Sequence, residues 1–370
     1  YNPMIMKYYV IAGEASGDLH GANLIHHIFS VDSSAQIRAW GGNRMQNEGA
    51  TIVKSIDEMS FMGFWEVATS LNKILKLLSL CKKDLKSFNP DVVILIDYPG
   101  FNLRIAKYAK SIGLKVVYYI SPQVWAWHRS RVYDIKKYVD VMIPILPFEK
   151  DFYRQYDVNV EYYGHPLVDE IEKHRRTENK EFRDSIAVLP GSRRSEIERM
   201  LPIFADAARK MPTQNFTVAA MSNIGIEYYN KILQNHIPDN MNFAIDCTYD
   251  ILSNAKAGII TSGTATLETA IFGLPQVVCY KTNPITYKIA RYVAKIKYIS
   301  LVNLILDKPL LTELIQHDCN SCRIVEELRK ITEDEAHITN MREGYSELLR
   351  KLNKEGVSKK IATAIVEGLV

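Results

Sequence analysis

The stretch that decides the fold runs from Gly258 to Tyr280 and reads GIITSGTATLETAIFGLPQVVCY. Its first residues end an apolar strand, and Ser262-Gly263-Thr264 forms a turn of small residues. Residues 265–272 have the composition of a helix, Gly273 stands where a helix-terminating glycine belongs, and residues 276–280 are rich in β-forming side chains. The stretch therefore predicts a βαβ unit whose turn lies at the carboxyl end of the first strand.

The turn of this unit allows two interpretations. At such a place, the N–H groups that open a helix point into a crevice and favour anions such as phosphate. Glu268 lies four residues after Thr264, near enough to accept hydrogen bonds from ribose hydroxyls. Alternatively, Ser262 and Thr264 are ordinary capping residues and Glu268 is a solvated acid in the first helical turn. The unit alone leaves both open.

Composition bounds the class of protein. A chain of 370 residues with 47% hydrophobic and 24% charged residues is typical of a globular protein with two domains. The net charge of +4 is mild and we find no nucleic-acid-binding motif, so we expect no nucleic-acid partner. The five cysteines are scattered, which is typical of a reducing cytoplasm. We find neither a signal peptide nor an apolar run of the ~20 residues that a membrane span needs.

A carboxylate follows the most apolar strand of the first half. Residues 91–96 (DVVILI) have the pattern of a central parallel strand that is buried on both faces. Asp97 comes next, and the carboxyl end of a central strand lies in the ligand crevice of a doubly wound sheet. Asp97 could serve there as a general base, or it could hydrogen-bond its own turn.

An unusually apolar helix is predicted over residues 66–83. Leu71, Leu75 and Leu78 belong to a stripe of helical period, but further apolar residues widen the surface and lysines rim it. One interpretation is a core helix that covers the sheet. The other is an interfacial patch that dips into a membrane, with its lysines at anionic headgroups.

The second half repeats the pattern of strands and helices. The charged run 170–183 is predicted to be the domain boundary, and the turn PGSRR at 190–194 precedes a capping box at 195–198. Asn303 falls in an apolar loop and needs a partner if it is buried. Residues 333–370 are predicted to form one long terminal helix.

The chain contains ten sequence blocks in the same order as the lipid A disaccharide synthase family, which it resembles over nearly its whole length. The blocks are GEASGD at 13–18, GGxxM at 41–45, MGFWEV at 62–67, IDYPGFN at 96–102, SPQVWAW at 121–127, LPFEKxFY at 146–153, GHP at 164–166, LPGSR at 189–193, SGTATLE at 262–268 and SLVNL at 300–304.

The resemblance implies a glycosyltransferase of the GT-B type, with two Rossmann-like domains that face a central cleft. The domains would span residues 1–168 and 169–345, with residues 346–370 crossing back to the first. The enzyme would be inverting and would use neither a metal nor a cofactor. It would transfer 2,3-diacylglucosamine from its UDP derivative to the 6-hydroxyl of 2,3-diacylglucosamine 1-phosphate, forming a β(1→6) disaccharide and UDP.

The resemblance also implies roles for individual residues. Asp97 matches the general base of the family. The UDP-sugar would be bound by Ser192, Arg193, Ser262, Gly263, Thr264, Glu268 and Asn303. Candidates on the acceptor side are Glu14, Ser16, Trp125 and Arg131. The membrane-contact residues would be Phe64, Trp65, Leu71, Leu75 and Leu78.

Partners and location follow from the same resemblance. We expect a homodimer formed by exchange of C-terminal segments, and a peripheral enzyme on the cytoplasmic face of the inner membrane of a Gram-negative bacterium. The sequence departs from the family pattern at His128, Val302 and Gly100, where arginine, proline and an acid are usual. These departures bear on acceptor-phosphate contacts and loop shape rather than on the reaction class.

Two other functions share this architecture. A UDP-N-acetylglucosamine 2-epimerase would need no lipid-facing helix, so the apolar patch argues against it. A nucleotide-binding membrane scaffold without enzymatic activity would have no use for Asp97.

Overall fold

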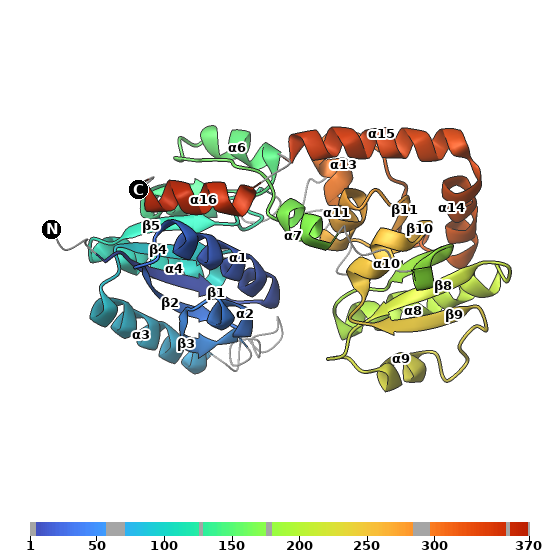
Figure 1. The fold of residues 1–370 in the computed structure, drawn as a ribbon, viewed down its shortest axis with the longest axis horizontal. Helices are drawn as coiled ribbons and strands as arrows, with labels where there is room; N and C mark the ends of the chain where they lie inside the picture. The colour runs from blue at the N-terminus through green and yellow to red at the C-terminus, as the bar shows by residue number, and fades with distance from the viewer. Residues whose placement is uncertain are drawn as a thin grey trace. The chain divides into compact units, whose positions relative to one another are not determined.

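The computed structural model describes residues 5–56, 71–125, 129–174, 180–283, 297–352 and 356–368 (Figure 1). The chain divides into two compact units. Unit 1 comprises residues 1–166 with 353–370, and unit 2 comprises residues 167–352.

Unit 1 is built on a six-stranded sheet of order β3-β2-β1-β4-β5-β6, in which every pairing is parallel. Its strands are β1 (Lys7–Ala12), β2 (Gln36–Gly41), β3 (Thr51–Ser55), β4 (Val92–Ile96), β5 (Lys115–Tyr119) and β6 (Val141–Ile143). All five residues of β4 are buried, as the apolar run predicts for a central strand.

Helices cover both faces of this sheet. One face packs against α3 (Leu71–Phe88), α4 (Pro99–Ser111), α5 (Arg131–Tyr138) and α6 (Pro147–Arg154). The other packs against α1 (Ala15–Val31), α2 (Asn43–Asn47) and α16 (Val357–Val366). Figure 1 shows α16, in red, beside α1. Two covered faces explain why the strands read as continuous apolar runs rather than alternating ones.

The sheet of unit 1 reverses its direction of growth between β1 and β4. Strands β2 and β3 extend it on one side, and β5 and β6 on the other. The loops that follow β1 and β4 therefore leave the carboxyl edge side by side, at the place where doubly wound sheets bind ligands.

A buried carboxylate explains why GEASGD and GGxxM occur together in unit 1. Asp18 is 4% exposed and lies in the first turns of α1. Its carboxylate accepts hydrogen bonds from the backbone N–H groups of Gly42 (2.7 Å), Arg44 (3.2 Å) and Met45 (3.2 Å). A Cβ at Gly42 would lie 2.5 Å from an Asp18 oxygen, so this close approach requires glycine.

Unit 2 has a second parallel sheet of six strands, in the order β12-β11-β10-β7-β8-β9. Its strands are β7 (Ser185–Leu189), β8 (Asn215–Ala220), β9 (Met241–Ile245), β10 (Ala257–Thr261), β11 (Gln276–Tyr280) and β12 (Glu313–Ile315). Its α-helices are α7 (Leu167–His174), α8 (Arg194–Arg209), α9 (Ile226–Ile232), α10 (Thr248–Asn254), α11 (Thr264–Ile271), α13 (Leu301–Leu306), α14 (Ser321–Glu333) and α15 (Glu335–Lys351). The βαβ unit predicted at 258–280 is confirmed as β10-α11-β11, with Gly273 at a positive φ of 79°.

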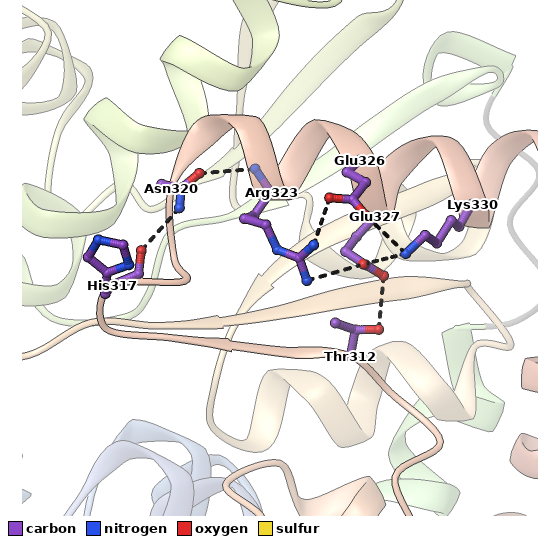
Figure 2. Close-up of polar contacts among 7 residues, drawn as sticks. All are labelled: Thr312, His317, Asn320, Arg323, Glu326, Glu327 and Lys330. Carbon is purple, nitrogen blue, oxygen red and sulfur yellow. Dashed lines mark hydrogen bonds and ion pairs between the residues drawn. The ribbon is translucent and has the colours of Figure 1, made fainter.

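A buried glutamate ties α14 to the start of β12 (Figure 2). Glu327 is 3% exposed, accepts a hydrogen bond from the Thr312 hydroxyl at 2.9 Å and pairs with Lys330 at 2.8 Å. Asn320 caps the helix by accepting from the Arg323 N–H at 3.0 Å. The short edge strand β12 is thereby held by a helix as well as by β11.

The charged run 170–183, predicted to be the domain boundary, begins inside α7, whose buried residues are Leu167, Val168 and Ile171. One prediction about a helix is wrong. Residues 333–370 do not form one helix: Asp334 ends α14 and caps α15, and α16 begins after Gly356, whose φ is 64°. The predicted domain boundaries lie at 168/169 and 345/346, whereas the units divide at 166/167 and 352/353.

We also searched the described residues for a helix that is long and apolar enough to cross a bilayer, and found none.

Candidate active site

Asp97 stands at the reversal point of unit 1 on an unusual backbone. Asp97 and Tyr98 have positive φ angles of 44° and 50°, a conformation that residues other than glycine seldom adopt. The Asp97 N–H donates to the carbonyls of Tyr119 (3.3 Å) and Ile120 (3.2 Å). Its own carbonyl accepts from the Asn102 amide (2.7 Å) and the Tyr118 hydroxyl (2.6 Å). Hydrogen bonds to the backbone N–H and carbonyl of Asp97 thus hold the turn, while its carboxylate is half-buried.

The pKa of Asp97 suits a base near neutral pH. Burial, and secondarily the negative charge of Glu14, raise this pKa to about 6, and the Tyr98 N–H opposes the rise. An ordinary solvated aspartate would be a weaker base, and a more strongly shifted one would stay protonated. The geometry therefore leaves the Asp97 carboxylate able to accept a proton above pH 6.

The loop after β1 interlocks with the loop after β4. A Cβ at Gly13 would lie 2.3 Å from the Tyr98 ring, so the ring can pack there only against glycine. Glu14 precedes α1 at its N-cap position, and Glu14 and Ser16 are both exposed in the first turn. The predicted candidates Glu14, Ser16 and Asp97 therefore share one edge of the sheet.

Trp125 and Arg131 come from the next loop along this edge, which follows β5. The half-buried Trp125 donates its indole N–H to Glu149 at 3.1 Å and meets the Phe148 ring edge-on at 4.9 Å. Arg131 opens α5 and is close enough to the buried Tyr118 hydroxyl to lower its pKa, against the larger rise caused by burial.

In unit 2, β7 and β10 are neighbours at the reversal of the sheet order. The turn after β7 carries Ser192 and Arg193, and the turn after β10 carries Gly263 and Thr264; all four residues are exposed. Two of the predicted UDP-binding turns thus lie side by side at the carboxyl edge of one sheet, where helix N-termini favour phosphate.

The capping box predicted at 195–198 is wrong. Helix α8 begins at Arg194, and Glu196 accepts from the N–H groups of Ser192 (3.0 Å) and Arg193 (3.3 Å). The cap lies earlier because Gly191, at a φ of 119°, turns the chain so that these two N–H groups face the first helical turn.

Glu268 is not a solvated surface acid. It is half-buried in α11, and the Tyr249 hydroxyl donates to its Oε1 at 3.1 Å. Burial raises its pKa, and the bond from Tyr249 opposes that rise. One side of the carboxylate is therefore held in place by α10.

Asn303 lies in α13 rather than in the predicted loop, and it is 1% exposed. Its amide donates to the carbonyl of Leu311 (2.9 Å) and to Glu313 Oε1 (3.0 Å), and its oxygen accepts from the Leu311 N–H (2.9 Å). Both amide hydrogens are already used, so a direct donation to UDP would require these bonds to break. The predicted need for a partner is confirmed.

The bonds of Asn303 lead back to the predicted phosphate turn. Glu313 also accepts from the backbone N–H groups of Ile299 (3.0 Å) and Ser300 (2.9 Å). The Ile299 carbonyl in turn accepts from the Ser262 hydroxyl at 3.2 Å. Asn303 is therefore linked to the Ser262 turn through Glu313 and Ile299.

Of the predicted membrane-contact residues, Leu75 is 55% exposed in α3, and Leu80 is also exposed, at 44%. The prediction that Leu78 contacts the membrane is wrong, because Leu78 is 6% exposed and packs in the core with Cys81 and Leu85. Leu78 shares its face of α3 with Ile74, Cys81 and Leu85, and that face packs on the sheet. Phe64, Trp65 and the Leu71 side chain lie outside the described residues.

Two residues near the carboxyl edge of the unit 1 sheet were not predicted as site residues, although both fall in quoted blocks. Asn102 sits in IDYPGFN and its amide donates to the carbonyls of Ile96 (3.1 Å) and Asp97. Glu149 sits in LPFEKxFY and is 1% exposed, and burial raises its pKa to about 8. Pro147 two residues before Glu149 signals a helix start with an acid at its third position, but not the contact with Trp125.

We predict that Asn303→Ala lowers the free energy of unfolding by about 2–4 kcal/mol, because it strands the buried backbone N–H and carbonyl of Leu311 and removes one of the two donors to Glu313 Oε1. The free energy of unfolding is measured by chemical denaturation monitored by circular dichroism. The exposed Asn340→Ala is the matched control. Equal stability of the two variants would contradict the structural role of Asn303.

Known proteins resemble the chain in sequence over nearly its full length. Residues 8–366 match a family described as "Lipid-A-disaccharide synthetase". A lipid-A-disaccharide synthase of Syntrophus aciditrophicus is 36% identical over 365 residues, which cover 95% of each chain. Another, of Nitrosococcus oceani, is 36% identical over 97% of this chain and 96% of its own.

Solved structures resemble the chain at much lower identity. A UDP-GlcNAc 2-epimerase from Neisseria meningitidis bound to UDP-GlcNAc has a TM-score of 0.70 at 12% identity, covering 98% of this chain and 100% of its own. The glycotransferase of kitacinnamycin has a TM-score of 0.66 at 12% identity and full coverage of both chains. Such likenesses show the fold alone, and they confirm the predicted GT-B type with two Rossmann-like domains. The sequence matches decide what the fold leaves open between glycosyltransferase and epimerase: the chain belongs to the lipid-A-disaccharide synthetase family.

Proposed function

We propose that this chain transfers 2,3-diacylglucosamine from UDP-2,3-diacylglucosamine to the 6-hydroxyl of 2,3-diacylglucosamine 1-phosphate. The products are the β(1→6) disaccharide 1-phosphate and UDP. Membership of the family supports the reaction class. The observation that carries the proposal is Asp97, a half-buried carboxylate with a pKa of about 6 at the reversal point of its sheet.

In this mechanism Asp97 accepts the proton of the acceptor 6-hydroxyl. The freed oxygen attacks C1 of the donor sugar from the face opposite the UDP, and the bond between C1 and the phosphate oxygen breaks. UDP leaves with the bonding electron pair, so the configuration at C1 is inverted. One proton moves to Asp97 and one negative charge to UDP, which balances the step.

The turns of unit 2 are suited to the leaving group. Negative charge grows on the diphosphate as the bond breaks, and preorganised N–H groups and guanidinium groups stabilise such charge. Arg193 and the N-terminus of α11 at Gly263 and Thr264 are exposed at one sheet edge for this role. Glu268, held by Tyr249, is the candidate acceptor of ribose hydroxyl bonds. Ser262 and Asn303 would act by shaping the turn, and Ser192 by its exposed hydroxyl.

Both substrates carry acyl chains, so we infer that unit 1 contacts a membrane surface. Helices α3, α4 and α5 contain eleven Lys and Arg and two Asp, a net charge of +9. The whole chain has +4, so the rest of it is net negative. Helix α3 adds exposed Leu75 and Leu80 to this positive layer. Cations beside exposed leucines fit anionic headgroups and the acyl boundary below them.

We further infer a peripheral location on the cytoplasmic face of the inner membrane of a Gram-negative bacterium. We also infer a homodimer that exchanges C-terminal segments. Val357, Ile361 and Ile365 of α16 are buried against α1 and its neighbours, and the same apolar face would accept the α16 of a second copy.

We predict that purified enzyme in detergent forms the disaccharide and UDP from the two substrates in the presence of EDTA. Asp97→Asn should lower kcat by about 10²–10⁴ because general-base catalysis is lost. Calorimetry should find UDP binding unchanged in this variant. Full activity of Asp97→Asn would remove Asp97 as the base.

We predict that Glu14→Gln moves the acid limb of the kcat/KM profile to lower pH. The ionised Asp97 is the active form, so activity rises with pH through a pKa of about 6. Removing the charge of Glu14 eases ionisation and lowers that pKa. The exposed Glu161→Gln in the same unit is the control, and a limb that stays in place in both variants would contradict the coupling.

We predict that the double variant Leu75→Ser, Leu80→Ser binds less to vesicles of phosphatidylglycerol and phosphatidylethanolamine in a sedimentation assay. Ile245 of unit 2 is similarly exposed, at 47%, so Ile245→Ser is the matched control and should bind as wild type does. Undiminished binding of the double variant would show that α3 is not the contact surface.

A further inference from the structure

The buried carboxyl of Glu149 has two separate duties. It is 1% exposed at the third position of α6. Oε2 accepts from the Leu146 backbone N–H at 3.0 Å, which is an ordinary helix cap. Oε1 accepts from the Trp125 indole N–H at 3.1 Å, which is not. The second contact joins α6 to the loop after β5.

A cap alone does not explain the burial of this group. A helix cap works at the surface, where the carboxylate keeps its hydration, whereas burying it costs free energy. Desolvation accordingly raises the pKa of Glu149 to about 8, although Leu146, Trp125 and Ser121 all offer hydrogen bonds that oppose the rise. Burial of this carboxylate is unfavourable, and one of its oxygens accepts a hydrogen bond from the Trp125 indole. The arrangement therefore points to a role for Trp125.

The loop that carries Trp125 is also attached to the Asp97 turn. Strands β4 and β5 are neighbours, and the Ile120 carbonyl at the start of the loop accepts from the Asp97 N–H at 3.2 Å. The next residue, Ser121, is hydrogen-bonded through its hydroxyl to the Tyr153 hydroxyl of α6 at 2.5 Å. The loop is thus fixed to Asp97 at one end and to α6 at Ser121 and Trp125.

The Trp125 ring is held on two sides and remains half-exposed. Glu149 fixes its N–H, and the Phe148 ring meets it at an interplanar angle of 87°. An indole in one fixed orientation offers a large apolar surface at little cost in conformational entropy. The apolar face of a sugar ring is a matching partner for that surface.

We propose that Glu149 is a positioning residue, which holds the Trp125 indole as a platform for the acceptor sugar beside Asp97. The inference rests on the proposed function, because it assigns the platform to the acceptor of that reaction. Glu149 acts through Trp125 and touches no substrate itself.

A double-mutant cycle tests this action through Trp125. Glu149→Gln leaves one acceptor oxygen where two donors must be served, and Trp125→Phe keeps a ring without its N–H. In assays above pH 8, where Glu149 is ionised, each change should raise the acceptor KM about tenfold, the effect of losing one hydrogen bond to a charged group, with kcat and the donor KM unchanged. The double variant should match Trp125→Phe alone. The exposed Glu161→Gln is the control and should behave as wild type.

Other outcomes contradict the inference. If the two effects multiply in the double variant, or if Glu149→Gln changes the donor KM instead, Glu149 does not act through Trp125. If Glu149→Gln does not fold, Trp125→Phe decides alone, and an unchanged acceptor KM overturns the proposal. Absence of disaccharide from the wild-type enzyme would instead refute the proposed function, and this inference with it.

A spectroscopic measurement separates the contact from the activity. Glu149→Gln should shift the tryptophan emission of the protein, and it should cause no shift in the Trp125→Phe background, since the affected indole is then absent. An equal shift in both backgrounds would mean that Glu149 acts on the fold as a whole.

Discussion

The side-chain amide of Asn102 is the interaction on which the unit 1 site depends. From the first turn of α4, this buried group donates to the carbonyls of Ile96 and Asp97, at the point where β4 ends. Together with the Tyr118 hydroxyl, it holds Asp97 and Tyr98 in a left-handed conformation that their side chains disfavour. The strain is local, and the bonds that oppose it are buried. The carboxylate of Asp97 thereby lies at the sheet edge, while the backbone N–H and carbonyl of Asp97 make the hydrogen bonds that hold the turn.

The same division of labour recurs in unit 2. Asn303 and Glu313 are occupied with backbone groups, and through Ile299 they support the turn that contains Ser262. Exposed residues of the turns after β7 and β10 lie at the carboxyl edge of the same sheet, namely Arg193, Gly263 and Thr264. A residue in one of the quoted blocks can therefore have a structural role: Asn303 supports the Ser262 turn through Glu313 and Ile299, and Glu149 holds the Trp125 indole. Because a supporting residue keeps its bonds when no ligand is present, its role is visible in the structure of the chain alone.

Local signals were sufficient where chain neighbours decide the structure. The unit β10-α11-β11 could be predicted nearly to the residue, because small turn residues, a terminating glycine and β-branched strands act over a few positions. Asp97 could be placed at the sheet edge because a run as apolar as β4 has to be central. Predictions failed where distant contacts decide. Leu78 faces the core because α3 packs on the sheet. The contact between Glu149 and Trp125 joins the first turn of α6 to the loop after β5, which no pattern in the sequence pairs.

The central claim is that Asp97 takes the proton of the acceptor hydroxyl. The most direct measurement is a crystal structure of the Asp97→Asn variant with UDP and the monosaccharide 1-phosphate acceptor bound. The account predicts that the side-chain oxygen of residue 97 lies within hydrogen-bond reach of the acceptor O6, about 2.6–3.2 Å. An acceptor bound with O6 out of reach of residue 97, and beside another carboxylate or histidine, would contradict the account.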